Sequence, residues 1–414
     1  MRNVMQAATL ESKFPILAVE HDCIISKDAD ITVAYKVELP ELFTVTRNEY
    51  EAIHSAWAKA VKVLPNYSIV HRQDWFIEEN YTPDIQRDDL SFLSRSFERH
   101  FNERPYLRHT SYLFLTKTTK ERSRTQSNFT ALTRNFIIPK EMQDKDTVTR
   151  FLESCDQFER IINDSGFVRI TRMRKDEITG TENSAGIIEK YFSLSQEETT
   201  CLQDLTLGAA EMKVGDNCLC LHTLSDTDDL PGKVATDMRY ERLSTDRSDC
   251  RLSFAAPIGV LLTCNHIVNQ YLFIDDPAEN LKKFEKQARN MHSLSRYSRS
   301  NQINREWIEE YLNEAHSLGL TSIRAHCNVL AWSDDRNRLK QVKNDVGSQL
   351  ALMECKPRHN TVDTPTLFWA AIPGNAGDFP FEESYYTFIE QALCFFIGES
   401  CSRDSLSPFG IRMV

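Results

Sequence analysis

The 414-residue chain is long enough for two or three domains, and its 41% hydrophobic and 26% charged residues are ordinary values for a folded globular protein. A net charge of -11 argues against a general nucleic-acid-binding surface, because binding phosphates needs clustered Lys and Arg. No run approaches the roughly 18 apolar residues of a membrane-spanning helix, and residues 1–6 lack the apolar core of a signal peptide. We therefore expect a cytoplasmic protein whose 11 cysteines, without a CxxC pair, are reduced thiols.

Residues 1–118 predict a compact mixed-sheet domain with the order ββαβαβ. Thr46 and Glu49 form a capping box, so a helix is expected to begin there, and its apolar stripe ends before Pro65. Apolar and polar residues alternate over 31–39, which is typical of a strand with one buried face. The expected strands cover residues 16–26, 31–39, 67–77 and 106–116. The expected helices cover residues 47–64 and 90–101.

The polar and basic residues 117–134 predict a linker or an exposed loop. Residues 135–262 are expected to form a helix followed by a β-rich middle region. The expected helices cover residues 148–162 and 187–194. The expected strands cover residues 167–173, 217–224 and 252–262, and turn-forming residues cover 226–232.

Residues 263–414 predict an α/β domain that contains a helical hairpin near 276–319. Asp276, Pro277 and Glu279 give the start of its first helix, and Gly319 ends its second helix. The expected strands cover residues 267–274, 321–332 and 350–355. Further helices are expected over residues 339–346 and 385–396.

Strands that alternate with helices favour a sheet-based fold over a helical bundle. The predicted class is α+β (mixed α/β), with two or three small mixed-sheet subdomains, helices packed on them, and the long hairpin near 276–319.

A nucleotide-binding loop is not predicted. The motif GxxxxGK[ST] needs two glycines, a lysine and a hydroxyl group that reaches Mg²⁺. The nearest string is Gly232-Lys233-Val234, but Thr227 stands where the first glycine belongs and Val234 has no hydroxyl.

A zinc site is one interpretation of Cys218, Cys220 and His222, because alternation along a strand places all three side chains on one face. Cys264 and His266 could supply the remaining ligands of a tetrahedral site. Zinc ligands more often come from turns, and cysteine is among the most buried residues, so core packing is the default interpretation. The sequence leaves the question open.

The remaining candidates also have structural interpretations. His326 and Cys327 are adjacent on a predicted strand, so they point to opposite faces. Tyr385 and Tyr386 lie in an apolar pattern that predicts packing. Turn and cap chemistry accounts for the acidic clusters Asp226/Asp228/Asp229 and Asp275/Asp276. We therefore expect no catalytic, cofactor-binding or metal-binding residue.

Four strings resemble the TraG-type conjugation ATPases of Bacteroidetes conjugative transposons, which are relatives of the large type IV secretion ATPases. The strings are DWFIEENY (74–81), LSRSFERHFNERP (93–105), DVGSQLALME (345–354) and IPGN (372–375). The resemblance covers essentially the whole chain, and residues 364–414 resemble the hinge that leads into the motor domain of that family. None of the strings is a catalytic motif.

The resemblance implies a non-catalytic N-terminal docking and oligomerisation domain of a conjugative-transfer ATPase. A RecA-like P-loop motor, with ATP and Mg²⁺, would then belong to a C-terminal domain that this chain lacks. The chain as given would not be an enzyme, whereas the full-length protein would be an ATPase. Its implied partners are its own ATPase domain, inner-membrane channel proteins and further copies of itself, without direct nucleic-acid contact.

The implied location is the cytoplasmic side of the inner membrane, held there through partners. Two alternatives stay open. An independent cytoplasmic enzyme with an unrecognised site would show a deep polar pocket with converging titratable groups. A nucleic-acid adaptor would gather basic residues on one face despite the acidic total.

Overall fold

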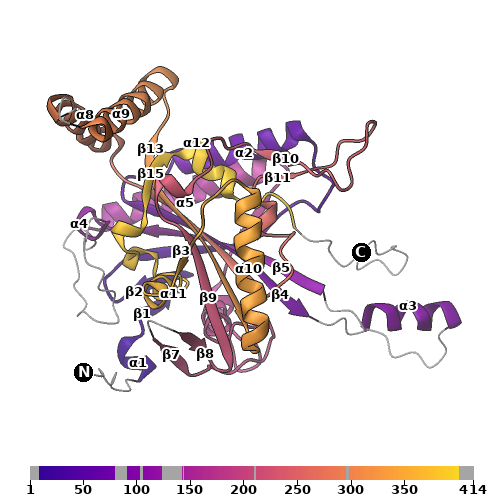
Figure 1. Cartoon of the computed structure of the whole chain (residues 1–414). Helices are drawn as coiled ribbons and strands as arrows, with labels where there is room; N and C mark the ends of the chain where they lie inside the picture. Colours follow the sequence, from indigo (N-terminus) through magenta and orange to yellow (C-terminus); the bar gives the residue numbers. More distant parts are fainter. Residues whose placement is uncertain are drawn as a thin grey trace, which may run out of the picture.

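A computed structural model describes residues 9–79, 91–102, 106–123, 142, 144–208, 211–294 and 298–400. These residues form a mixed α/β fold on one antiparallel sheet of 13 strands, which confirms the predicted fold class (Figure 1). Strands from all three ranges predicted as domains join this sheet, and the boundaries between those domains stay a prediction.

The sheet is continuous from β1 to β7. Its strands are β1 (Ile16–Glu20), β2 (Cys23–Ser26), β3 (Ile31–Glu38), β4 (Ser68–Glu79), β5 (Tyr106–Lys117), β6 (Arg169–Arg172), β7 (Leu205–Leu207), β8 (Met212–Val214), β9 (Asn217–Leu224), β12 (His266–Ile274), β13 (Ser322–Ser333), β14 (Arg358–Asn360) and β15 (Tyr385–Phe388). The order is β1-β2-β3-β5-β4-β12-β13-β9-β8-β7, with β6 on β3, β14 on β9 and β15 on β13. A separate hairpin joins β10 (Asp237–Arg239) to β11 (Arg251–Ser253).

The helices either cover the two faces of the sheet or project from it. They are α1 (Leu10–Lys13), α2 (Arg47–Lys62), α3 (Phe92–Asn102), α4 (Lys120–Ser123), α5 (Lys145–Asp164), α6 (Lys175–Thr179), α7 (Ile187–Ser193), α8 (Pro277–Leu294), α9 (Arg299–Leu318), α10 (Arg336–Leu352), α11 (Thr364–Ala370) and α12 (Ile389–Ala392). One face packs against α2, α5 and α10, and the other against α7 and α11. Because side chains alternate along a strand, β4 sends Val70 to the first face and Ile69 and Trp75 to the second.

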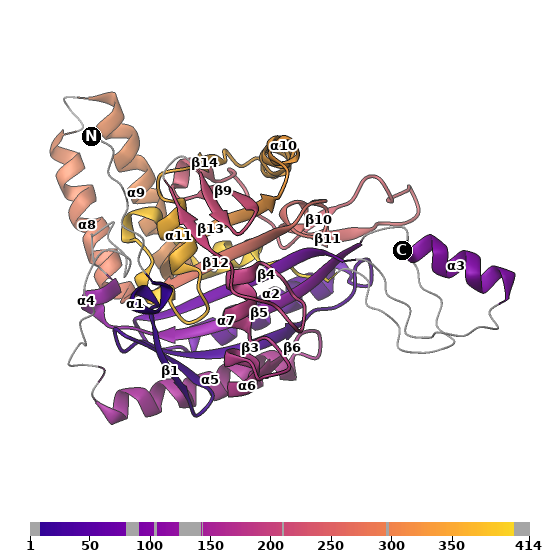
Figure 2. The ribbon, with the colours of Figure 1, turned by 90° about the horizontal axis from the view of Figure 1, so that it is seen from below.

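Two helical features project from this body. The α8–α9 hairpin, predicted near 276–319, stands out from one end of the sheet (Figure 1), and the view from below shows the two helices side by side (Figure 2). Helix α3 lies between β4 and β5 in the sequence and away from the sheet in both views. The sheet and its covering helices thus form the body of the molecule, and the α8–α9 hairpin and α3 extend from it.

Local signals in the sequence give the helix starts correctly. The capping box at Thr46 is present, with its backbone N–H donating to Glu49 Oε2 at 2.7 Å. Asp276 Oδ1 accepts the backbone N–H of Ala278 at 3.0 Å, and Gly319 ends α9 in the left-handed region.

The single strand predicted over 16–26 is wrong, because these residues form the β1–β2 hairpin. His21 and Asp22 make its two-residue turn with φ of 51° and 59°. Positive φ at both positions is the requirement of a type I′ turn, whose twist suits a hairpin. Because the turn is only two residues long, the apolar pattern of the sequence does not reveal it.

Three other predicted elements differ from the structure. The strand predicted over 350–355 is wrong, since α10 continues to Leu352 and buries Val346 and Leu350 on one stripe. The strand over 252–262 ends at Ser253, because a short 3₁₀ turn containing Pro257 follows. The helix predicted over 385–396 begins as β15, which pairs with β13 before α12 starts.

Some predictions lie partly outside the described residues. The linker expected over 117–134 begins with the end of β5 and α4, and its residues 124–134 are not among those described. The same holds for residues 80–81 and 103–105 of the resemblance strings and for residues 401–414.

Candidate functional site

The candidate site is a cluster of buried polar side chains that holds residues 396–400, a segment we call the strap. The strap leaves α12 and ends the described chain at Ser400. Its last residue joins the loop before α2, because Ser400 N–H donates to Pro40 O at 2.9 Å and Leu42 N–H donates to Ser400 O at 3.0 Å. The strap is thus tied to an early part of the chain by its backbone.

Arg72 of β4 is the centre of the cluster, which we call the clamp. Its Nη2 donates to Ile397 O at 2.6 Å, and its guanidinium carbon lies 4.9 Å from the centroid of the Phe396 ring. Its Nε lies 3.0 Å from Asp74 Oδ2, and both side chains are almost completely buried. A paired charge in the sheet therefore supports the backbone of the strap.

Asp74 extends the clamp to β5. Burial by itself would raise the pKa of Asp74, but the Arg72 charge and a hydrogen bond from His109 outweigh it, so this pKa lies below its usual range. His109 Nε2 lies 3.1 Å from Asp74 Oδ1, and its Nδ1 lies 3.2 Å from Ser400 Oγ. The imidazole thus connects the carboxylate to the end of the strap, while its ring stacks on Phe76 at 4.2 Å.

Glu399 is the strap's own charged group, and it is completely buried. Its carboxylate accepts Tyr50 Oη–H at 3.0 Å, Ser253 Oγ–H at 3.0 Å and Ser253 N–H at 3.1 Å. Burial raises the pKa of Glu399 to about 7, although the bonds from Ser253 and Tyr50 and the Arg72 charge act in the opposite direction. This carboxyl group consequently titrates near neutral pH.

Gly398 fits between the same two partners. A Cβ atom at this position would come within 3.0 Å of the Tyr50 ring and 3.1 Å of the Ser253 Cβ. The backbone of the strap can therefore approach α2 and β11 this closely because residue 398 is glycine.

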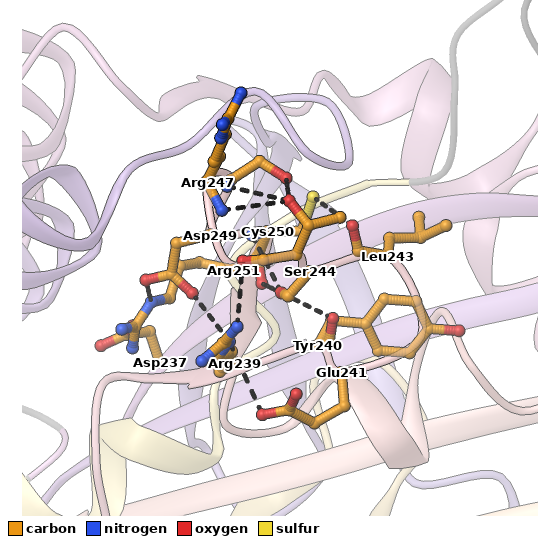
Figure 3. Close-up of polar contacts among 12 residues, drawn as sticks. Asp237, Arg239, Tyr240, Glu241, Leu243, Ser244, Arg247, Asp249, Cys250 and Arg251 are labelled. Carbon is orange, nitrogen blue, oxygen red and sulfur yellow. Dashed lines mark hydrogen bonds and ion pairs between the residues drawn. The ribbon is translucent and has the colours of Figure 1, made fainter.

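The β10–β11 hairpin supplies Ser253 to the clamp and is itself held by charges (Figure 3). Arg251 bridges Asp237 at 2.8 Å and Asp249 at 2.7 Å. Arg239 lies 3.3 Å from Asp249 on the same side of the hairpin. Asp237 is buried and Asp249 is exposed, so the Arg251–Asp237 pair is the better shielded of these contacts between the two short strands and their loop.

An open pocket of about 640 Å³ borders the end of the strap. It is lined by residues 38–41, Asn163 and residues 166–169, with Glu38, Glu41 and Arg169 as its charged groups. All three are exposed, and the pocket faces solvent, so it does not have the enclosed shape that favours catalysis. The clamp can hold the backbone of the strap, and Glu399 can bind or release a proton.

The candidate zinc ligands are buried in the core on the α10 side of the sheet. Cys220 and Cys264 pack in one apolar cluster, where burial raises the pKa of each thiol to about 12. Cys218 Sγ donates to Glu211, and the rings of His222 and His359 lie 5.3 Å apart. His266 stacks on Phe76 and bonds the Cys264 carbonyl through Nδ1.

Within the described ranges, no group of three or more His, Cys, Asp or Glu side chains has the arrangement of a metal site. The cysteines and histidines at 218–222 and 264–266 are all buried.

The other candidate residues have structural partners. His326 Nδ1 donates to Glu383 O on one face of β13, and Cys327 lies in the apolar cluster on the other. Tyr385 is buried, and Tyr386 Oη accepts from Lys283. Gly232 and Lys233 do not connect a strand to a helix, as a nucleotide-binding loop does. They lie in the loop between β9 and β10.

The acidic clusters divide between turns and ion pairs. Asp226 caps a short 3₁₀ turn, and Asp229 accepts from Arg358 at 2.8 Å. Asp276 caps α8, but Asp275 forms a buried pair with Arg324 at 2.6 Å, so capping explains only one member of that cluster.

The residues of the clamp were absent from the candidates drawn from sequence. One available signal was the pair Arg72 and Asp74, two positions apart in a predicted strand, which puts opposite charges on one face. Asp74 also opens the first string that resembles the TraG family. Tyr50, Ser253 and Glu399 gave no such signal, because they meet only in the folded chain.

A family model described as "Domain of unknown function, B. Theta Gene description (DUF3875)" matches residues 3–55. The described part of this range contains α1, β1–β3 and the start of α2, and hence Tyr50 and the loop that binds Ser400. No curated protein matches the chain. Among the described residues, no helix combines the length and the apolar composition needed to cross a membrane.

Proposed function

We propose that this chain is the N-terminal docking and oligomerisation domain of a TraG-type conjugative-transfer ATPase. In this proposal it couples a C-terminal P-loop motor to the transfer channel from the cytoplasmic side of the inner membrane. The domain itself binds no ATP. Its partners are the motor domain, the channel proteins and further copies of the chain.

The observation that supports this function best is the clamp on the strap. Residues that lead toward a motor domain would have to transmit force, and the strap is held by a buried ion pair rather than by solvated contacts. Arg72 and Asp74 lie in β4, and β4 lies at the centre of the sheet. A displacement of the strap would therefore act directly on a central strand of the sheet.

The first experiment is to read the coding sequence that follows Val414. The proposal expects a strand, then GxxxxGK[ST], then a helix. A stop codon at this position would remove the motor from the proposal and favour an adaptor or an independent enzyme.

The second experiment tests coupling in the full-length protein. Tyr50→Phe combined with Ser253→Ala removes two hydrogen bonds to Glu399 and so loosens the strap. We expect DNA transfer between cells to fall at least tenfold while ATP hydrolysis by the purified protein is retained. Arg338→Ala, which breaks an exposed pair with Glu78, is the matched control and should transfer normally. Normal transfer by the strap variant would reject the coupling role.

A further inference from the structure

The α8–α9 hairpin is mounted rigidly on the sheet although it projects from it. The Tyr311 ring of α9 stacks on Phe388, with the ring centroids 4.5 Å apart, and packs at a tilt against Phe284 of α8 at 4.9 Å. Tyr311 Oη also donates to Ser322 Oγ at 2.7 Å. The base of the hairpin is therefore fixed, and its two long outer faces remain for other contacts.

The outer face of α9 is apolar and acidic. Trp307 is 58% exposed and Leu318 is 68% exposed, which is unusual for such large apolar side chains. They belong to one stripe at helical spacing, made up of Ile303, Trp307, Glu310, Glu314 and Leu318. This stripe lies beside the contact with α8, because Trp307 is one helical turn from Tyr311, which packs on Phe284. Trp307, Glu310 and Leu318 are exposed, and Glu314 is half-buried.

The outer face of α8 is basic. Lys282, Lys286 and Arg289 are exposed and recur at helical spacing. Lys286 is two residues, or roughly 200°, from Phe284, which packs against α9. The hairpin thus carries acidic and aromatic surface residues on α9 and exposed basic residues on α8.

The two faces match in spacing as well as in charge. Counted from the C-terminal end of α9, the steps between Glu314, Glu310 and Trp307 are four and three residues. Counted from the N-terminal end of α8, the steps between Lys282, Lys286 and Arg289 are also four and three residues. With a rise of about 1.5 Å per residue, both sets are separated by about 6 and 4.5 Å. Antiparallel helices would align all three pairs.

We propose that the α9 face of one copy of this chain binds the α8 face of a second copy. Glu314 pairs with Lys282, Glu310 pairs with Lys286, and the Trp307 ring receives the Arg289 guanidinium in a cation–π contact. Leu318 meets Ala278 at the end of the same interface. The aliphatic stems of the lysines cover the apolar stripe.

This contact joins different faces of identical chains, so it is heterologous. Because α8 and α9 are antiparallel within a hairpin, successive hairpins keep the same orientation, and the copies form a ring or an open array. The inference deepens the proposed oligomerisation function by naming its surface.

The test is sedimentation of the purified 414-residue chain over a range of concentrations. We expect wild type to form species larger than a dimer, and added salt to weaken them. Glu310→Lys/Glu314→Lys makes both faces basic, and Lys282→Glu/Lys286→Glu makes both acidic, so each variant alone should sediment as a monomer. A mixture of the two should associate again, because each supplies the face that the other needs.

Two variants control for the change of charge alone. Glu153→Lys/Asp156→Lys on α5 and Lys340→Glu/Lys356→Glu near α10 alter exposed residues elsewhere and should associate like wild type. A monomeric wild type, or charge-reversed variants that associate like wild type, would overturn the interface. A complex that stops at a dimer, or a mixture that stays monomeric, would overturn the head-to-tail pairing. None of these results tests the coupling role of the strap, because that role is measured by DNA transfer.

Discussion

Glu399 is a residue whose affinity for a proton rises on folding. Its ordinary pKa of 4.5 rises to about 7 in the folded chain, chiefly through burial, so the folded state holds its proton more tightly than the unfolded state. The resulting stabilisation is complete below pH 4.5 and is lost as the pH rises through 7, with an upper limit of about 3 kcal/mol.

We therefore expect the free energy of unfolding of Glu399→Gln to rise relative to that of wild type between pH 5 and 8. Urea unfolding at several pH values measures it. The comparison isolates Glu399, because the buried histidines with lowered pKa values are the same in both proteins. Asp74 acts in the opposite sense, since its lowered pKa gives stability that is lost as the pH falls below its ordinary 3.8, and so outside this window. Parallel pH profiles for wild type and E399Q would show that the buried carboxyl does not titrate as described.

The buried Arg72–Asp74 pair gives a second prediction at this scale. Arg72→Met removes one partner and leaves the Asp74 carboxylate uncompensated, so we expect a loss of about 3–5 kcal/mol in unfolding free energy. Arg72→Met combined with Asp74→Leu should recover much of it, because neither charge is then buried. Chemical denaturation compares the two variants with Arg338→Ala, for which a change below about 1 kcal/mol is expected. A double variant no more stable than the single one would argue against this account.

At the scale of the elements, the β1–β2 turn is open to improvement. His21 has a φ of 51°, which glycine adopts without strain, so His21→Gly should stabilise the fold by about 0.5–1 kcal/mol. Asp22 has a φ of 59°, but its Oδ1 accepts the Lys175 N–H at 2.7 Å. Asp22→Gly should therefore gain little or lose stability. The difference in melting temperature between the two variants is the measurement, and equal shifts would contradict it.

The same elements show what the sequence could predict. Helix α2 and the α8–α9 hairpin were predictable because caps, glycine and a 3.6-residue apolar period are local signals. The turn at His21 was not, since neither turn residue is glycine and the apolar pattern continues on both sides. The strand predicted at 350–355 failed for a related reason, because a short apolar run suits a buried helix end as well as a strand.

At the scale of the whole molecule, the mixed α/β class followed from alternating strands and helices, but the union of the strands in one sheet did not. Strand β13 carries β9 on one part of its edge and β15 on another, although the two lie far apart in the sequence. The clamp depends on the same long-range order, because Tyr50 and Glu399 are 349 positions apart. A pattern of local periodicity contains no information on such pairings.

The position of β4 between β5 and β12 has a consequence for synthesis on the ribosome. β4 ends at residue 79, whereas the partner for its second edge begins at residue 266. At roughly 5–20 residues per second, the nascent chain exposes this long unpaired edge for about 10–40 s before β12 emerges. During that interval β4 can pair with other chains, so the yield of folded protein should depend on chaperones that bind the growing chain.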